Sequence, residues 1–316
     1  MKKILVIGAS GQIGSELTPA LRKVYGNDNV VAADCVYPLK GDLASGGPSC
    51  KIDATKKEDI AAAVKQYQID AIYNLAAILS AKAEANPMLG WDVGVGAVLN
   101  CLEVAREFNC QLFTPSSIGA FGEGTPANNT PQDTIQRPKT IYGVTKVTGE
   151  LLSDYYFKRF GVDARSVRYP GLISNVTLPG GGTTDYAVDI YYAAIRDGKF
   201  TCPLNKGTFM DMMYMPDAIH AAIDIMEADP SKLIHRNSFN VTAMSFDPEM
   251  IAAEIKKHIP NFTMDYQIDT LRQGIADSWP NSMDDSCARA EWGWKPDFDL
   301  SAMTVDMITV LKTKLL

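Results

Sequence analysis

The feature that most restricts the fold of this chain is a run of glycines close to its start. An apolar run at residues 4–7 predicts a buried strand and leads directly into residues 8–14, where three glycines are spaced GxxGxxG. In such a turn the glycines permit a sharp bend, the close approach of a pyrophosphate and tight packing of the next helix. Residues 12–25 predict that helix, whose first N–H groups attract an anion. The cofactor-binding residues predicted here are Gly8, Gly11, Gln12, Ile13 and Gly14.

Apolar runs and helical patterns alternate through the rest of the first half of the chain. This alternation specifies parallel strands joined by right-handed crossovers, with helices on both faces of the sheet. The predicted fold class is therefore α/β, with a Rossmann-type doubly wound parallel sheet. Further strands are expected at residues 30–33, 71–73, 112–113 and 164–167, and helices at 59–67, 88–108 and 141–160.

The second half has a different rhythm, which predicts a smaller, substrate-binding lobe. We expect a nucleotide-binding domain over residues 1–171 and the second lobe over 172–316, with an interleaved boundary. Helices are expected at 186–196, 248–258 and 303–315, and strands at 209–215, 238–241 and 262–266. Four methionines between 210 and 215 are interpreted as strand packing and not as a cofactor site.

The composition narrows the possible partners. The 316 residues carry a formal net charge of −7, which disfavours nucleic acid as a partner because the surface repels phosphate. The six cysteines form no CxxC pair, which predicts reduced thiols and a cytoplasmic location. The three histidines form no HExxH motif, so no metal site is predicted. No apolar run reaches the roughly 18 residues that span a bilayer, so no membrane partner is expected.

Acidic and small residues after the following strands complete the predicted nucleotide site. Asp34 ends the second strand, about 20 residues beyond the last glycine of the turn. A carboxylate there accepts hydrogen bonds from both ribose hydroxyls and repels a 2′-phosphate, which favours NAD over NADP. Asp53 is interpreted either as a partner of the adenine amino group or as a cap or loop residue. Leu75, Ala76 and Ala77 are small enough to let the backbone pass beside the cofactor.

A YxxxK motif supplies the predicted catalytic pair. Tyr142 and Lys146 lie four residues apart on a predicted helix, so both side chains share one face. An isolated phenol is a poor base at neutral pH, but an adjacent ammonium and the positive nicotinamide of NAD⁺ stabilise a phenolate. Such a phenolate takes the proton of an alcohol while hydride leaves its carbon. Tyr142 and Lys146 are also predicted to be cofactor-binding residues, with Lys146 binding the nicotinamide ribose. A serine of the pair Ser116 and Ser117 is expected to hold the substrate oxygen.

The order and spacing of these motifs resemble the extended short-chain dehydrogenase/reductase superfamily, as in its sugar-nucleotide epimerases. The resemblance covers about residues 1–175 and assigns the catalytic hydroxyl to Ser117, five positions before Gly122. It also implies that Tyr169 contacts the cofactor. Two departures from the epimerase pattern put sugar-nucleotide binding in doubt: Asn74 replaces a histidine, and residues 169–171 replace a Phe-Asn pair.

Residues 178–188 and 278–294 are similar to the hallmark segments of short-chain-type L-threonine 3-dehydrogenases. With them the resemblance covers nearly the whole chain. It implies oxidation of the 3-hydroxyl of L-threonine by NAD⁺ to 2-amino-3-oxobutanoate, without a metal. It also implies a homodimer joined by the helices at 88–108 and 141–160.

The expected substrate contacts each have a plainer alternative. Thr183, Thr184 and Asp185 enter a predicted helix, where N–H groups receive a carboxylate and Asp185 pairs with an ammonium. Alternatively, these residues only cap the helix. Ser80 either binds the amino acid or is an ordinary loop serine, and Trp279 either walls the pocket or packs in the core. Ser117 and Tyr142 complete the predicted substrate site.

Two other functions are compatible with the same motifs. A nucleotide-sugar epimerase or reductase needs clustered cations for the diphosphate, and its candidates, Lys206, Arg236 and Arg289, are scattered along the chain. The other alternative is a scaffold that senses NAD without catalysis. The joint presence of serine, tyrosine and lysine in the catalytic pattern disfavours that scaffold.

Overall fold

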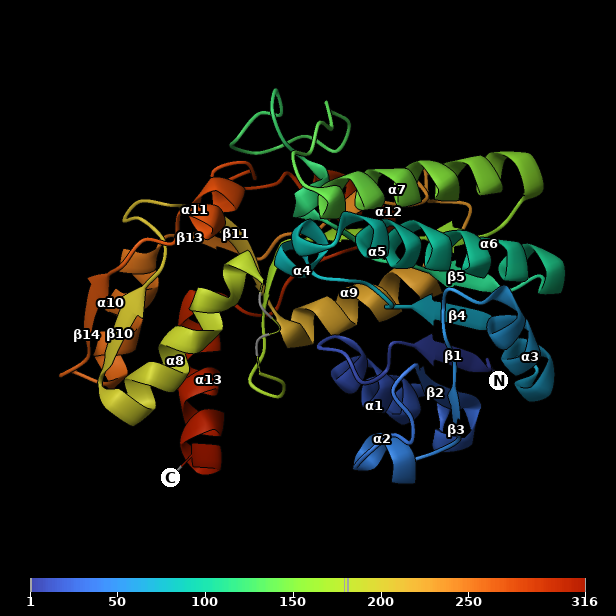
Figure 1. Ribbon diagram of the computed structural model, residues 1–316, viewed down its shortest axis with the longest axis horizontal. Helices are drawn as coiled ribbons and strands as arrows, with labels where there is room; N and C mark the ends of the chain where they lie inside the picture. The colour runs from blue at the N-terminus through green and yellow to red at the C-terminus, as the bar shows by residue number, and fades with distance from the viewer. Residues whose placement is uncertain (1, 179, 181, 316) are drawn as a thin grey trace.

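The computed structural model describes residues 2–178, 180 and 182–315, and within them the centre is a six-stranded sheet (Figure 1). Its strands are β1 (Ile4–Ile7), β2 (Val30–Asp34), β3 (Ser49–Lys51), β4 (Ala71–Asn74), β5 (Gln111–Phe113) and β7 (Ala164–Arg165). They are parallel and lie in the order β3-β2-β1-β4-β5-β7. The order reverses between β1 and β4, the point at which doubly wound folds bind their ligands. The predicted fold class is confirmed.

Both faces of the sheet are covered by helices because strand side chains alternate between faces. Ile4 and Val6 of β1 pack into one apolar cluster and Leu5 and Ile7 into another, and all four are at most 1% exposed. The first cluster includes side chains of α1 (Gly14–Tyr25) and α9 (Met215–Glu227). The second includes side chains of α3 (Lys57–Tyr67), α6 (Ala97–Phe108) and α7 (Ile141–Phe160).

Smaller sheets lie beyond the central one. One has the parallel order β12-β8-β6, formed by β6 (Ser116–Ser117), β8 (Val167–Tyr169) and β12 (Phe239–Asn240). A second, mixed sheet has the order β13-β11-β9, formed by β9 (Gly171–Ile173), β11 (Met210–Tyr214) and β13 (Met244–Phe246). A third pairs β10 (Lys199–Cys202) with β14 (Thr263–Tyr266). Helices α8 (Tyr186–Asp197), α10 (Pro248–His258) and α13 (Leu300–Leu315) pack with these strands in a core of their own.

Two elements from the second half of the sequence, α9 and β12, pack against elements of the first half. Helix α9 packs on the central sheet, and β12 pairs with β8 beside the serine-bearing strand β6. The division at residue 171 stays a prediction. Helix α9 was not predicted from the sequence, although Pro216 at its first turn and Asp217 after it are a helix-start signal. The methionines of β11 are buried, as the packing interpretation predicted.

The helix predicted at 88–108 is interrupted in its middle. It consists of α5 (Pro87–Trp91), a π-helical turn over Asp92–Gly96, and α6. Among the described residues, Pro87–Phe108 is the one helix long and apolar enough, by length and composition alone, to cross a membrane. Asp92 and Glu103 interrupt its apolar residues, so it is not a continuous apolar run of about 18 residues. Its most apolar window is 44% buried, because one side packs into the core beneath it. That a membrane is not a partner stays a prediction.

Candidate active site

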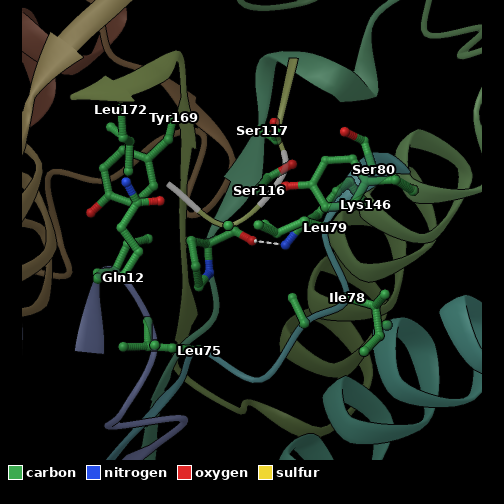
Figure 2. Close-up of a pocket in the computed structure, with 18 of the residues that line it drawn as sticks. Gln12, Leu75, Ile78, Leu79, Ser80, Ser116, Ser117, Lys146, Tyr169 and Leu172 are labelled. Carbon is green, nitrogen blue, oxygen red and sulfur yellow. Dashed lines mark hydrogen bonds between the residues drawn. The ribbon is translucent and has the colours of Figure 1, made fainter. Parts of the chain in front are cut away.

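A cavity of about 490 Å³ opens at the carboxyl ends of β1 and β4, beside the switch point of the sheet (Figure 2). Its walls come from the glycine turn, β6, one face of α7, and residues 169–172, 177–178, 180 and 182–185. All predicted site residues except Asp34 and Asp53 line it. These residues are Gly8, Gly11, Gln12, Ile13, Gly14, Leu75, Ala76, Ala77, Ser80, Ser117, Tyr142, Lys146, Tyr169, Thr183, Thr184, Asp185 and Trp279.

The glycine turn is shaped so that side chains are excluded from it. Gly8 has a φ of +82°, and a Cβ there would lie 3.0 Å from the backbone carbon of Leu75. A Cβ on Gly14 would lie 2.2 Å from the carbonyl oxygen of Gly8. Helix α1 therefore starts against the end of β1, and the turn that leads into it, residues 11–14, lines the cavity. This bare backbone cradle fits the pyrophosphate of a dinucleotide.

The two acidic residues predicted for the adenosine half lie outside the main cavity. Asp34 is 8% exposed, and its carboxylate accepts hydrogen bonds from the backbone N–H of Ser10 (2.9 Å) and Val36 (3.0 Å). These bonds orient it beside the glycine turn, where each oxygen keeps a lone pair for a ligand. Asp53 instead accepts from the backbone N–H and the hydroxyl of Thr55, as in the loop interpretation; the next helix, α3, has Lys56 as its N-cap and no side-chain cap. The role of Asp53 toward adenine stays a prediction.

Asn74 is a further site residue that the sequence analysis treated only as a departure from the epimerase pattern. It ends β4, lines the cavity and is 1% exposed. Its Oδ1 accepts from the backbone N–H of Ala76 (3.3 Å), while its Nδ2 has no protein partner among the described residues. A buried donor without a partner costs free energy, so this amide fits a cavity that receives a polar ligand.

Helix α7 brings the predicted catalytic pair to the cavity. Thr140 caps its start by accepting from the N–H of Gly143 (3.1 Å). Lys146 Nζ lies 5.4 Å from the centre of the Tyr142 ring and donates to the carbonyl oxygen of Pro115 (2.7 Å; Figure 2). Ser117, two residues after Pro115, accepts from the backbone N–H of Gly119 (3.1 Å) through its hydroxyl oxygen. The ammonium thus lies beside the phenol, as the spacing predicted.

Gly119 supports the tyrosine in a way the sequence analysis missed. A Cβ on Gly119 would lie 3.2 Å from Cε1 of Tyr142, which is tighter than ordinary contact. The absence of a side chain therefore lets the phenol ring pack directly on this backbone. A glycine two residues after the predicted catalytic serine was the available signal.

The predicted substrate turn forms a short 3₁₀ helix over Thr183–Asp185. Asp185 accepts from the backbone N–H of Gly182 (2.6 Å), and Thr183 Oγ1 has no protein partner in the described part of the chain. A Cβ on Gly171 would lie 2.6 Å from Cγ2 of Thr184. The absence of a side chain at Gly171 therefore leaves the space that Thr184 occupies at the cavity wall. Two residues of the resembling segment, Pro179 and Gly181, lie outside the described residues.

Ser80 and Trp279 complete the wall of the cavity. Ser80 begins α4 (Ser80–Ala85) and is 5% exposed. Trp279 packs on a small cluster of Ile118, Phe121 and Met283, so its wall and packing interpretations both hold geometrically. It also borders a second, polar cavity of about 340 Å³ and thus lies between the two.

The wall that carries Trp279 is anchored by a buried acid, Asp211 of β11. Asp211 is 1% exposed and accepts from the backbone N–H of Met283 (2.7 Å) and from the Thr242 hydroxyl. Burial raises the pKa of Asp211 from its ordinary 3.8 to about 7. Between about pH 4 and pH 7 the Asp211 carboxyl is therefore protonated in the folded chain and ionised in the unfolded chain. The stability that the neutral Asp211 contributes is complete below about pH 4 and is lost as the pH rises through about 7.

We expect Asp211→Asn to remove this pH dependence, because an amide stays neutral and still bonds both partners. Thermal unfolding of both proteins at pH 5, 6, 7 and 8 measures it. The midpoint of Asp211→Asn should rise relative to the unsubstituted protein as the pH increases from 5 to 8. Other titrating groups cancel in this difference, so a difference that stays constant with pH contradicts the assignment.

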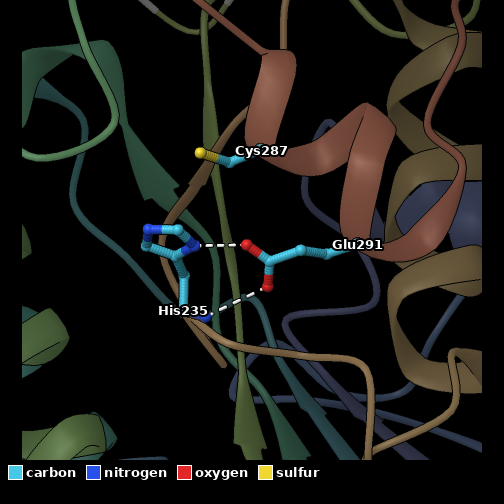
Figure 3. Close-up of side chains that lie close together, drawn as sticks. All are labelled: His235, Cys287 and Glu291. Carbon is cyan, nitrogen blue, oxygen red and sulfur yellow. Dashed lines mark hydrogen bonds and ion pairs between the residues drawn. The ribbon is translucent and has the colours of Figure 1, made fainter.

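A cluster of potential metal ligands lies away from the cavity (Figure 3). Cys287 and Glu291 lie on α12 (Ser286–Trp292) and face His235. The Glu291 carboxylate bonds Nδ1 of His235 and accepts from the backbone N–H groups of Ile234 and His235. These hydrogen bonds tie the loop that carries His235 to helix α12. The expectation that the chain holds no metal stays a prediction.

Comparisons with known proteins agree with this site. Residues 4–241 match the NAD dependent epimerase/dehydratase family. An uncharacterized epimerase/dehydratase from Staphylococcus aureus (strain USA300) is 55% identical, over 99% of this chain and 98% of its own length.

Two solved structures are similar over almost their full lengths. L-threonine dehydrogenase from Clostridium difficile has a TM-score of 0.97 and 54% identity, covering 99% of this chain and 98% of its own. A monomeric L-threonine 3-dehydrogenase from a metagenome has a TM-score of 0.94 and 46% identity, covering 98% and 99%. The family match spans most of the chain and its glycine cradle fits a dinucleotide, so this protein belongs to the NAD dependent epimerase/dehydratase family and uses NAD as its cofactor.

Proposed function

We propose that this protein is an L-threonine 3-dehydrogenase, which oxidises the 3-hydroxyl of L-threonine to 2-amino-3-oxobutanoate. The observation that carries the proposal is the meeting of Ser117, the Tyr142–Lys146 pair and the turn Thr183–Asp185 in one cavity. A small amino acid needs groups that handle its hydroxyl at one end and partners for its charges at the other. The two similar solved dehydrogenases support the same substrate.

Each residue at the hydroxyl end has a defined task in this proposal. Tyr142 accepts the hydroxyl proton, and the positive charge of Lys146 stabilises the resulting phenolate. Lys146 is oriented for this by its bond to the Pro115 carbonyl. Ser117 uses its hydroxyl to hold the substrate oxygen beside Tyr142. NAD⁺, when bound, supplies the hydride acceptor.

The turn Thr183–Asp185 is proposed to bind the charged end of the amino acid. Thr183 Oγ1 is buried without a protein partner among the described residues, and a hydroxyl in that position is stabilised by a ligand oxygen. The carboxylate of Asp185, which is 8% exposed, supplies the negative charge that an ammonium requires. Ser80 and Trp279 close the remaining sides.

The cations of the second half do not favour a nucleotide sugar. Lys206 is 73% exposed, Arg236 pairs with Asp163, and Arg289 pairs with Asp285. None of the three lines the main cavity of the described chain. A diphosphate would lack the clustered positive charges that normally bind it.

The proposal is tested with L-threonine, L-serine and a UDP-sugar, each with NAD⁺, followed by the absorbance of NADH. L-Threonine should be oxidised fastest, and the product should be 2-amino-3-oxobutanoate. Activity with the UDP-sugar alone would overturn the substrate. Binding of NAD⁺ without any substrate-dependent reduction would support the sensing alternative.

Asp34→Asn is expected to weaken the preference for NAD⁺ over NADP⁺. The substitution removes the negative charge that repels the 2′-phosphate of NADP⁺. The same charge strengthens the hydrogen bonds to the ribose of NAD⁺, and its loss should lower the affinity for NAD⁺ about tenfold or more. The measurement is the ratio of kcat/KM for the two cofactors. Asp53→Asn is the matched control and should leave this ratio unchanged; equal ratios for all three proteins would contradict the role of Asp34.

We also propose a homodimer, formed through α5, α6 and α7, which lie side by side (Figure 1). Large apolar side chains are exposed along these helices, and such patches mark interfaces. They are Met88, Leu89, Trp91, Leu99, Val144, Leu151 and Tyr155. Light scattering should give twice the mass of one chain, and the mass of Leu151→Glu should fall to that of a single chain. A monomer at micromolar concentration would reject the dimer; the similar metagenome enzyme is described as monomeric.

We further infer a cytoplasmic location. All six cysteines are free thiols in the structure, as the reducing cytoplasm favours. Cell fractionation followed by detection of the protein tests this.

A further inference from the structure

The face of α7 that carries the catalytic pair continues to a buried glutamate. Glu150 follows Lys146 by four residues, so Tyr142, Lys146 and Glu150 lie along one face of the helix. Glu150 also lines the cavity, and its side chain is 6% exposed. A charge this deeply buried requires partners.

Arg168 and two polar side chains supply these partners. Arg168 donates from Nε to Glu150 Oε1 (2.9 Å) and from Nη2 to Oε2 (2.8 Å), which is a bidentate pair. Gln136 donates to Oε2 (2.8 Å), and the Ser116 hydroxyl donates to Oε1. Arg168 is itself held by the carbonyl of Gln132 (2.8 Å) and by Asn240 (3.1 Å). The carboxylate therefore has a fixed position.

Ser116 links this fixed carboxylate to the catalytic residues. Its neighbour Pro115 accepts the hydrogen bond of Lys146, and its other neighbour Ser117 is the proposed partner of the substrate oxygen (Figure 2). Ser116 also pairs in register with Arg168 between β6 and β8. Three consecutive residues of this segment thus meet Lys146, Glu150 and the substrate site in turn.

We propose that Ser116 and Glu150 are positioning residues, whose hydrogen bond fixes residues 115–117 against α7 and so sets the geometry of Lys146 and Ser117. The consequence for turnover rests on the proposed function. The bond joins residues 34 positions apart and, together with the bond from Lys146 to Pro115, couples β6 to the helix face bearing the catalytic pair.

Ser116→Ala tests this role, with Gln136→Ala as the matched control. Both substitutions remove one hydrogen bond to the same carboxylate and leave the Arg168 pair intact, but only Ser116 belongs to the segment 115–117. Ser116→Ala should lower kcat about tenfold, the worth of one buried hydrogen bond. The affinity for NADH, measured by fluorescence, should stay unchanged in both variants. Gln136→Ala should keep kcat within about twofold of the unsubstituted protein, because the lost bond lies at the edge of the Glu150–Arg168 pair and contributes little.

Hydrogen exchange supplies a readout that does not depend on the reaction. Peptides covering residues 111–122 should exchange faster in Ser116→Ala than in Gln136→Ala, at similar thermal stability. Equal losses of kcat in the two variants, or unchanged exchange in Ser116→Ala, would overturn the positioning role. If the unsubstituted protein fails to oxidise L-threonine, the proposed function fails, while the exchange comparison still decides whether Ser116 holds this segment.

Discussion

Tyr142→Phe should lower kcat for L-threonine oxidation by about 10²–10⁴, the usual worth of a positioned general base. The substitution removes only the phenol oxygen. The ring stays packed on Gly119, because the close contact at that glycine involves Cε1 and not the hydroxyl. Lys146 keeps its bond to Pro115, so NAD⁺ should still bind. Steady-state rates of NADH formation measure kcat, and fluorescence titration measures NADH affinity.

Tyr192→Phe is the control for this experiment. It removes a phenol hydroxyl from α8, at a half-buried side chain that lies outside both the cavity and the proposed dimer interface. Its kcat should equal that of the unsubstituted protein. Near-full activity of Tyr142→Phe would instead assign proton removal to another group.

Gly14→Ala should abolish measurable NADH binding at concentrations that saturate the unsubstituted protein. The new Cβ would lie 2.2 Å from the Gly8 carbonyl oxygen and 2.7 Å from the Cα of Ala9. Both are backbone atoms, so the clash cannot be relieved by rotating a side chain. Either the turn or the start of α1 must move, and each would displace the N–H groups that face the pyrophosphate.

Gly274→Ala separates this effect from the general consequences of replacing a helical glycine. Gly274 lies inside α11 (Thr270–Ala276), and a Cβ there would meet nothing within 4 Å. Alanine should leave NADH binding unchanged and raise the unfolding midpoint slightly, because it favours the helix by about 1 kcal/mol. Unimpaired NADH binding by Gly14→Ala would show that the cradle does not hold the cofactor.

Much of the fold follows from local patterns in the chain. The strand, the glycine turn and α1 are adjacent in sequence, so their arrangement depends on nearby residues alone. The strand–helix alternation predicted the parallel sheet for the same reason. Helix α9 was not predicted because it follows the methionine-rich strand β11 without an intervening loop, although Pro216 and Asp217 are a helix-start signal.

The predicted site residues were also those with a local signature. Tyr142 and Lys146 share a face because four residues make about one helical turn. Asn74 and Glu150 were not predicted as site residues, since a lone asparagine or glutamate has no signature of its own. Their roles come from what surrounds them: a donor left without a protein partner, and an arginine from another strand.

The sequence alone determined the α/β class, the glycine cradle for the dinucleotide and the shared face of the catalytic pair, because residues close in the chain specify each of them. Only the tertiary structure decided which distant segments meet at the cavity. Thr184 packs against Gly171, where a side chain would clash, and Glu150 binds both Ser116 and Arg168. Asp53 bonds Thr55, a choice its position in the sequence left open. Contacts between distant residues depend on how whole helices and strands pack, and the spacing of residues along the chain does not encode that packing.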